Sequence, residues 1–246
     1  MNRAILVLCA FLVAIFLFPS IVTAWNFKET ISGQSVRWRR DTIVLRLGRV
    51  DSCSDCPDRE AILFSLNRSV ARWMLVPGIP RITIVDDPSA VIDGLDGKNV
   101  VEFASVWPLA GVHPLANTLS SYDGDTGETL DTDIIINGEM RFYVGEMMPA
   151  SSEYDLDLVL THEIGHVLGL DESDVNDATM WGIFTRGEYV RRELSIDDID
   201  GITSLYSLSE DKYRTYSCEI EYGRGDSSFS LLIMLMVIIV LFCKRR

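Results

Sequence analysis

The strongest constraint in this sequence is a pair of histidines four residues apart inside an apolar helical segment. His162 and His166 bracket Glu163 in the pattern H-E-x-x-H. Apolar residues in 155–168 recur at three- and four-residue spacing, which predicts a helix, and Asp155 favours its N-terminal turn. Residues four apart project from one face of a helix. Both imidazoles can therefore bind one metal ion, and Glu163 can reach a water on that ion.

The residues around this helix indicate hydrolytic chemistry. Zinc acidifies a bound water, and a nearby carboxylate can accept its proton and pass it to a leaving amine, so Glu163 is the candidate general base. Gly169, three residues past His166, can end the helix in a left-handed conformation and turn the chain back toward the metal. A catalytic zinc takes a third protein ligand, and the candidates after this turn are Asp171 and Glu172.

Three segments in the same order resemble the metzincin zinc peptidases. Their pattern H-E-x-x-H-x-x-G-x-x-H matches at every fixed position except the last, where Glu172 replaces histidine. The tetrapeptide A-T-M-W, which contains Met180, resembles the methionine turn of the matrixin branch, the matrix metalloproteinases and their bacterial relatives. Residues 194–206 resemble the closing helix of a matrixin catalytic domain. The resemblance covers residues 35–208.

The resemblance implies an α+β fold, a matrixin-like catalytic domain. Its twisted, mostly parallel five-stranded sheet would carry an active-site helix and a C-terminal helix. Independently, runs of β-branched and apolar residues bounded by turn residues predict strands, and helical spacing predicts a helix. The expected helix is residues 58–75, and the expected strands are residues 42–47, 81–85, 99–103, 115–121 and 129–136.

The resemblance also implies the site of a zinc endopeptidase with one catalytic ion. His162, His166 and Glu172 would be its ligands, Glu163 its general base, and Met180 the hydrophobic base beneath the metal. An extended protein or peptide substrate would lie antiparallel to the edge strand. The residues implied in substrate binding are Leu115, Ala116, Gly182 and Phe184.

Two further metal sites of the family are less well matched. A structural zinc requires histidines where this chain has Asn117 and Ile135, so that ion is expected to be absent. Calcium is a second candidate ion because hard cations bind oxygen ligands, although polar turns explain the same residues. The candidate calcium residues are Asp123, Asp125, Asp131, Asp133 and Asn137.

The replacement of histidine by Glu172 keeps a second class of function open. A carboxylate is a competent zinc ligand, but its negative charge reduces the Lewis acidity of the metal. The alternative is a degenerate metzincin that has lost catalysis and acts as an extracellular binding module. Two histidines on a helix can also be ordinary polar residues, without any metal.

The two ends of the chain predict export. Residues 1–24 have the charge, apolar run and small-residue cleavage site of a secretory signal peptide, followed by a short segment, 25–34. After a juxtamembrane spacer, 209–228, the apolar run 229–243 precedes a basic cytoplasmic end, 244–246. Fifteen helical residues rise about 22 Å, short of a hydrocarbon core of roughly 30 Å. The run is therefore a short transmembrane helix or a sorting tail that is cleaved on export, and the domain is expected at a membrane or cell surface, outside the cytoplasm.

The net charge limits the classes of binding partner, and the cysteines bear on disulfide formation. A formal net charge of −14 argues against nucleic acid as a partner. Of the five cysteines, Cys53, Cys56 and Cys218 lie between the two apolar ends. Export to an oxidising compartment favours a disulfide between Cys53 and Cys56, or between one of them and Cys218.

Overall fold

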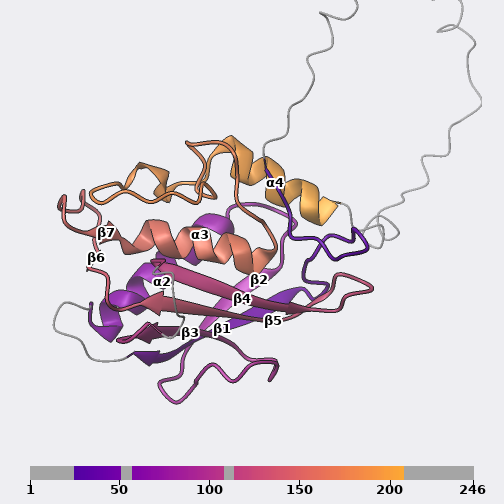
Figure 1. Ribbon diagram of the computed structural model, residues 1–246, viewed down its shortest axis with the longest axis horizontal. Helices are drawn as coiled ribbons and strands as arrows, with labels where there is room; N and C mark the ends of the chain where they lie inside the picture. Colours follow the sequence, from indigo (N-terminus) through magenta and orange to yellow (C-terminus); the bar gives the residue numbers. More distant parts are fainter. Residues whose placement is uncertain (1–24, 51–56, 108–113, 208–246) are drawn as a thin grey trace, which may run out of the picture. The chain divides into compact units, whose positions relative to one another are not determined.

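A five-stranded sheet forms one layer of the computed structural model, which describes residues 25–50, 57–107 and 114–207 (Figure 1). The strand order is β2-β1-β3-β5-β4, with β4 antiparallel to β5 and the other neighbours parallel. The expected mostly parallel sheet is therefore confirmed, and each strand begins and ends within three residues of its predicted position. The strands are β1 (Thr42–Val50), β2 (Arg81–Asp86), β3 (Asn99–Ala104), β4 (Ala116–Tyr122) and β5 (Thr129–Asn137).

The burial of each strand follows its place in the sheet. β1 alternates, and its side chains Ile43, Leu45 and Leu47 are fully buried while the intervening ones are more exposed. β3 and β5 lie in the interior of the sheet and are buried along almost their whole length, including polar residues such as Asn99, Glu102 and Asp133. β4 is an edge strand, and its outer edge borders the cleft described below.

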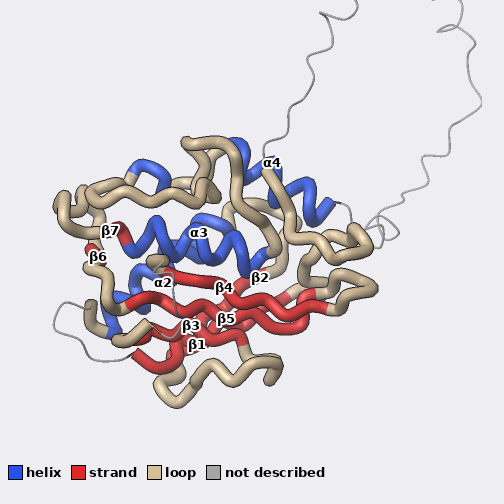
Figure 2. Tube along the Cα trace, in the orientation of Figure 1, coloured by secondary structure: helices blue, strands red, loops and turns tan. Residues whose placement is uncertain are grey.

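Two helices cover one face of the sheet, as Figures 1 and 2 show. Helix α2 (Arg59–Trp73) contacts β2 and helix α3 (Leu156–Leu168), which in turn contacts β4 and β5. The carboxylate of Asp58 accepts the Ala61 N–H at the start of α2, and that of Asp155 accepts the Leu158 N–H at the start of α3. These side-chain caps satisfy backbone donors that have no partner within the helix.

The closing helix predicted at residues 194–206 is α4 (Ile196–Ser207), and it is hydrogen-bonded to the end of α3. Its Ile202 and Leu205 are fully buried, and the Tyr206 hydroxyl donates to the Leu168 carbonyl at 2.8 Å. The short parallel pair β6 (Phe142–Tyr143) and β7 (Tyr154–Asp155) and the 3-10 turn η1 (Val190–Arg192) were not predicted. Segments this short have too few residues to show a periodic pattern.

The N-terminal segment, residues 25–34, pairs with the loop that follows α3. Phe27 forms an antiparallel bridge with Leu170. The Asn26 carbonyl accepts the Asp171 N–H at 2.9 Å, and the Lys28 N–H donates to the Gly169 carbonyl at 3.2 Å. Because this pairing resembles an added strand, it restrains the backbone of the loop between α3 and the methionine turn.

Several predicted features lie outside the described residues: the signal peptide, the spacer, the C-terminal apolar run and the three cysteines Cys53, Cys56 and Cys218. Within the described part of the chain, no helix combines the length and the apolar character needed to cross a membrane. Export, anchoring and disulfide pairing therefore remain predictions.

Candidate metal centre and cleft

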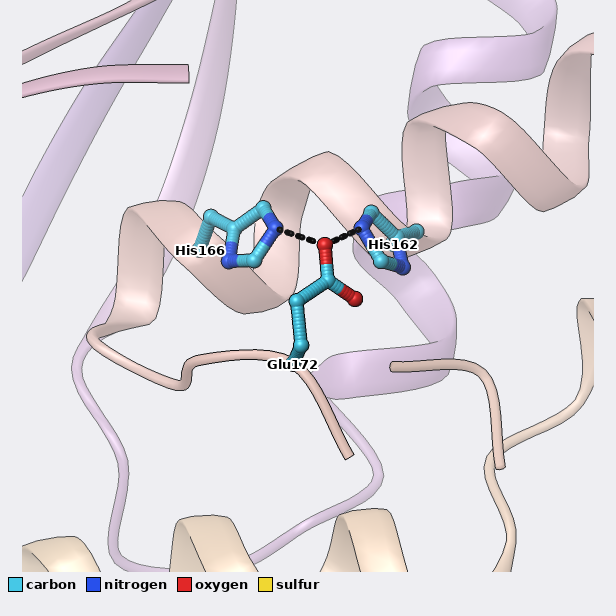
Figure 3. A group of neighbouring side chains, drawn as sticks. All are labelled: His162, His166 and Glu172. Atoms are coloured by element: carbon cyan, nitrogen blue, oxygen red, sulfur yellow. Dashed lines mark ion pairs between the residues drawn. The ribbon is translucent and has the colours of Figure 1, made fainter. Parts of the chain in front are cut away.

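Helix α3 carries the two histidines on one face. His162 and His166 lie with ring centroids 4.6 Å apart and nearly perpendicular planes. The helix ends at Gly169, whose φ of 106° is left-handed. This conformation strains most residues with a β-carbon, and a β-carbon here would also lie 2.3 Å from the Val36 carbonyl oxygen. The turn sends the chain back along the helix and brings Glu172 to the histidines (Figure 3).

The three side chains converge on a common point. The Oε1 atom of Glu172 lies 3.6 Å from His162 Nε2 and 3.7 Å from His166 Nε2. Their ligand atoms all lie within 4.8 Å of one another. Ligands bound to zinc at about 2.1 Å in a tetrahedron are separated by roughly 3.4 Å. The donor set, two imidazole nitrogens and one carboxylate, therefore fits a zinc ion in both chemistry and spacing.

Backbone carbonyls orient both imidazoles. His162 Nδ1 lies 2.9 Å from the Thr179 carbonyl oxygen, and His166 Nδ1 lies 3.0 Å from the Leu170 carbonyl oxygen. A carbonyl oxygen can only accept a hydrogen bond, so each Nδ1 carries the proton and donates. The lone pair of each Nε2 is then free to face Glu172, which is the arrangement that metal-binding histidines need.

The electrostatics of the three residues favour a positive charge between them. Partial burial raises the pKa of Glu172, but the neighbouring His162 and His166 outweigh it and lower that pKa to about 2. Burial lowers the pKa of His162, yet the carboxylates of Glu172 and Glu163 outweigh this effect and raise it. The cluster therefore keeps its carboxylate ionised and attracts a cation, whether a proton or a metal ion.

Asp171, the alternative third ligand, lies beside this cluster without joining it. Its Oδ1 accepts the backbone N–H of Glu172 at 2.9 Å. Among the described residues, the cluster of three metal-binding side chains consists of His162, His166 and Glu172. The geometry therefore favours Glu172 as the ligand and assigns Asp171 a role in shaping the turn.

Glu163, the candidate general base, is buried against β4. The Thr118 hydroxyl donates to Glu163 Oε2 at 2.5 Å, and the side chain borders the same cleft as the histidines. Thr118 was not singled out in the sequence, because 45 residues separate it from its partner. The hydrogen bond from Thr118 holds Oε2 of Glu163 in place and thereby orients the second carboxylate oxygen, Oε1.

Met180 is buried against helix α3, at Gly165. Its side chain is 2% exposed, and a β-carbon built on Gly165 would lie 2.3 Å from its sulfur, so α3 and the methionine turn approach closely. The buried Asp198 of α4 accepts the N–H groups of Thr179 and Met180, each at 2.9 Å. The closing helix therefore fixes the methionine turn, which in turn supplies the Thr179 carbonyl to His162.

A cleft of about 500 Å³ lies between the cluster and the edge of β4. All four residues implied in substrate binding border it: Leu115, Ala116, Gly182 and Phe184. The Phe184 ring packs edge-on against His162, with centroids 5.0 Å apart. The cleft therefore brings together the predicted metal ligands, general base and substrate-binding residues, whereas Met180 packs against α3 outside its lining.

The other predicted ion sites are not assembled in the same way. Asn117 and Ile135 face each other across β4 and β5, and neither side chain is a usual zinc ligand. Asp123 accepts hydrogen bonds from its own turn, at Asp125 and Thr126. Buried Asp133 has a pKa raised to about 7 by desolvation. Calcium binding in this region remains a prediction.

Comparison with known proteins agrees with this geometry. The matrixin family model, Peptidase_M10, matches residues 103–207. Metalloendoproteinase 1-MMP of Arabidopsis thaliana is 26% identical over 222 residues, 84% of this chain and 57% of that protein. Metalloendoproteinase 5-MMP of the same plant is 42% identical over 73 residues, 30% of this chain and 19% of that protein. Neutrophil collagenase of Homo sapiens is 40% identical over 75 residues, 30% of this chain and 16% of that protein.

A helix with H-E-x-x-H, a left-handed glycine turn and a methionine turn beneath it defines the metzincin class of metallopeptidase domains. Within that class, the family match and the relatives point to one branch. The chain carries a matrixin-like metzincin catalytic domain. It spans between 16% and 57% of the length of the three relatives named above.

Proposed function

We propose that this protein is a zinc-dependent endopeptidase that hydrolyses peptide bonds in proteins or peptides. The observation that carries the proposal is the convergence of His162, His166 and Glu172 beside Glu163, inside a cleft. The matrixin family match and metalloendoproteinase relatives support the same reaction class.

His162, His166 and Glu172 would hold the zinc ion, with both imidazoles pre-oriented by backbone carbonyls. Zinc in such a site acidifies water and polarises the carbonyl of the bond to be cleaved. Glu163 acts as the proton acceptor during attack and then as the proton donor to the leaving amine. Thr118 keeps the Glu163 carboxylate in place through its hydroxyl.

The edge of β4 provides the surface for the substrate. β4 pairs with β5 along one edge only, and Leu115, Ala116 and Thr118, at the start of β4, border the cleft. An extended peptide can add to such an edge as a further strand, held by backbone hydrogen bonds, while side-chain pockets select its sequence. Gly182 and Phe184 form part of the opposite wall.

We also propose that the domain acts outside the cytoplasm, tethered to a membrane or cell surface. The support is the sequence pattern of residues 1–24 and 229–246. The proposed substrates are consequently extracellular or surface-exposed proteins and peptides.

Substitution Glu163→Gln tests the catalytic assignment. It preserves the shape of the side chain but removes its ability to accept a proton, so casein hydrolysis should fall by at least about 100-fold. Zinc content and the melting temperature should stay near those of the parent protein. Glu60→Gln, an exposed change on α2, is the matched control and should retain full activity.

Two results would contradict the proposal. Undiminished cleavage by the Glu163→Gln protein would exclude Glu163 as the general base. A zinc-loaded parent protein that cleaves neither casein nor a peptide library would favour the alternative, a metzincin fold that binds partners without cutting them.

A further inference from the structure

The N-terminal segment places a lysine in the cleft. Lys28 borders the same cleft as His162 and Glu163, and its Nζ donates to the Ser120 hydroxyl of β4 at 3.1 Å. The Lys28 N–H donates to the Gly169 carbonyl and the Lys28 carbonyl accepts the Val36 N–H, and these backbone bonds hold the segment in this position. The lysine is therefore fixed by the fold at the substrate-binding edge.

Lys28 is the one Lys or Arg among the described residues that border the cleft. Three carboxylates border it as well, those of Glu163, Asp171 and Glu172. Burial lowers the pKa of Lys28 below its usual value, and these carboxylates offset that effect only in part. Within the described part of the chain, the hydrogen-bond partner of Nζ is a neutral hydroxyl rather than a carboxylate. The ammonium group therefore retains capacity for an acidic partner.

The position of Lys28 along β4 indicates which substrate residue it meets. Thr118 and Ser120 point to the same face of the strand, Thr118 to Glu163 and Ser120 to Lys28. Residues two apart on a strand lie about 6.8 Å apart on one face. In an antiparallel partner strand, the residues directly opposite also project to that face. A step from Thr118 to Ser120 corresponds to a step of two residues toward the N-terminus of the substrate.

We propose that Lys28 is a specificity-determining residue that selects an acidic side chain on the N-terminal side of the cleaved bond. The selected aspartate or glutamate lies opposite Ser120, two residues before the substrate residue that lies opposite Thr118. The inference rests on the proposed peptidase function for the direction of the substrate, and it names the substrate class as peptides with an acidic residue at this position. Without Lys28, the charged side chains that border the cleft, apart from the histidines, would be carboxylates, among the residues that the structure describes. These carboxylates would repel a peptide with an acidic side chain.

Cleavage of a proteome-derived peptide library tests the inference over many sequences at once. The zinc-loaded parent protein should cleave peptides with Asp or Glu at this position about 3- to 10-fold more often than those with Asn or Gln, as expected for a half-buried charge pair. Lys28→Met should abolish this enrichment, and Lys28→Glu should replace it with enrichment of Lys and Arg. The preference of the parent protein should weaken at high ionic strength.

Two control variants separate charge recognition from other roles of Lys28. Lys98→Met removes the same charge from a residue outside the cleft and should leave the preference unchanged. Ser120→Ala removes the hydrogen bond between the N-terminal segment and β4 but leaves the ammonium group, so it should also keep the preference. Melting temperatures of all variants confirm that they are folded.

Retention of peptides by the immobilised, zinc-loaded Glu163→Gln protein provides a second measurement that needs no cleavage. An excess of acidic over basic retained peptides that disappears with an added Lys28→Met change supports the inference even if the parent protein cuts nothing. Cleavage with an unchanged preference in the Lys28→Met protein overturns the inference and leaves the peptidase proposal intact. Equal retention of acidic peptides with and without the Lys28→Met change also overturns the inference.

Discussion

At the scale of single residues, the site departs from its family at Glu172. Its Oε1 atom lies 3.6 Å and 3.7 Å from the Nε2 atoms of His162 and His166, which supports the proposal that Glu172 is the third ligand. An anionic ligand binds zinc well but leaves less positive charge on the metal than a third histidine would. As the proposed ligand, Glu172 would reduce the Lewis acidity of the metal but would stay ionised, because His162 and His166 lower its pKa to about 2.

Zinc titration of two alanine variants tests this assignment. Glu172→Ala should lower zinc affinity by more than about 100-fold, because loss of a ligand costs more than loss of a residue that supports one. Asp171→Ala should lower it by less than about tenfold, since Asp171 bonds the backbone of the turn. Competition with a chromophoric chelator at fixed pH measures both affinities.

Glu172→His is the matched rescue of the same position. It restores three neutral ligands, so it should keep zinc bound and raise the rate of peptide hydrolysis. Zinc affinity in Glu172→Ala equal to that of the parent protein would show that the carboxylate is not a ligand.

At the scale of elements, the left-handed end of α3 determines where Glu172 lies. Gly169 turns the chain, and the N-terminal segment then pairs with the turned loop through Asn26 and Phe27. The Asn26 side chain also donates to the Glu172 carbonyl at 3.0 Å. A helix end and a distant segment therefore position the proposed third ligand together.

Substitution Gly169→Ala tests this coupling. The added β-carbon requires a left-handed alanine and approaches the Val36 carbonyl to 2.3 Å, so the free energy of unfolding should fall by roughly 2–4 kcal/mol. Zinc affinity should fall too, because the loop that carries Glu172 shifts. Denaturant unfolding and zinc titration measure the two effects.

Gly124→Ala is the control, because a β-carbon at this position meets no atom within 4 Å and its φ is not left-handed. It should leave both stability and zinc affinity near the parent values. A Gly169→Ala protein with parental zinc affinity would show that the turn does not position the ligand.

At the scale of the whole molecule, the described domain is one part of a chain whose two ends are proposed to carry export and anchoring signals. Residues 25–207, except two short internal segments, build the sheet, the helices and the cleft. The apolar run 229–243 with its basic end supplies the proposed tether. The domain and the tether can therefore be tested independently.

Deletion of residues 229–246 should release the domain in soluble form outside the cytoplasm, because the apolar run that would enter the membrane is removed. Deletion of residues 209–226, an equal length of spacer, should leave the protein attached. Fractionation of the exporting cells measures both outcomes, and the mass of the mature protein shows whether the tail is retained or cleaved. Continued membrane attachment after deletion of 229–246 would exclude this run as the tether.

The features that the sequence alone determined are local. Helix α3 follows from the spacing of its apolar residues, and its backbone geometry places His162 and His166 on one face because residues four apart coincide there. Gly169 marks the end of that helix because a left-handed residue is needed. The five strands of the sheet follow equally from alternating or continuous apolar runs bounded by turn residues.

The features that only the tertiary structure decided join residues far apart in the chain. The convergence of Glu172, rather than Asp171, on the histidines depends on the pairing of the loop with residues 26–28. The contacts of Thr118 with Glu163 and of Lys28 with Ser120 span 45 and 92 residues. Such contacts depend on strand register and on the packing of α3 against β4. Short-range periodicity carries no information about either, since it reports only which face of one element is buried.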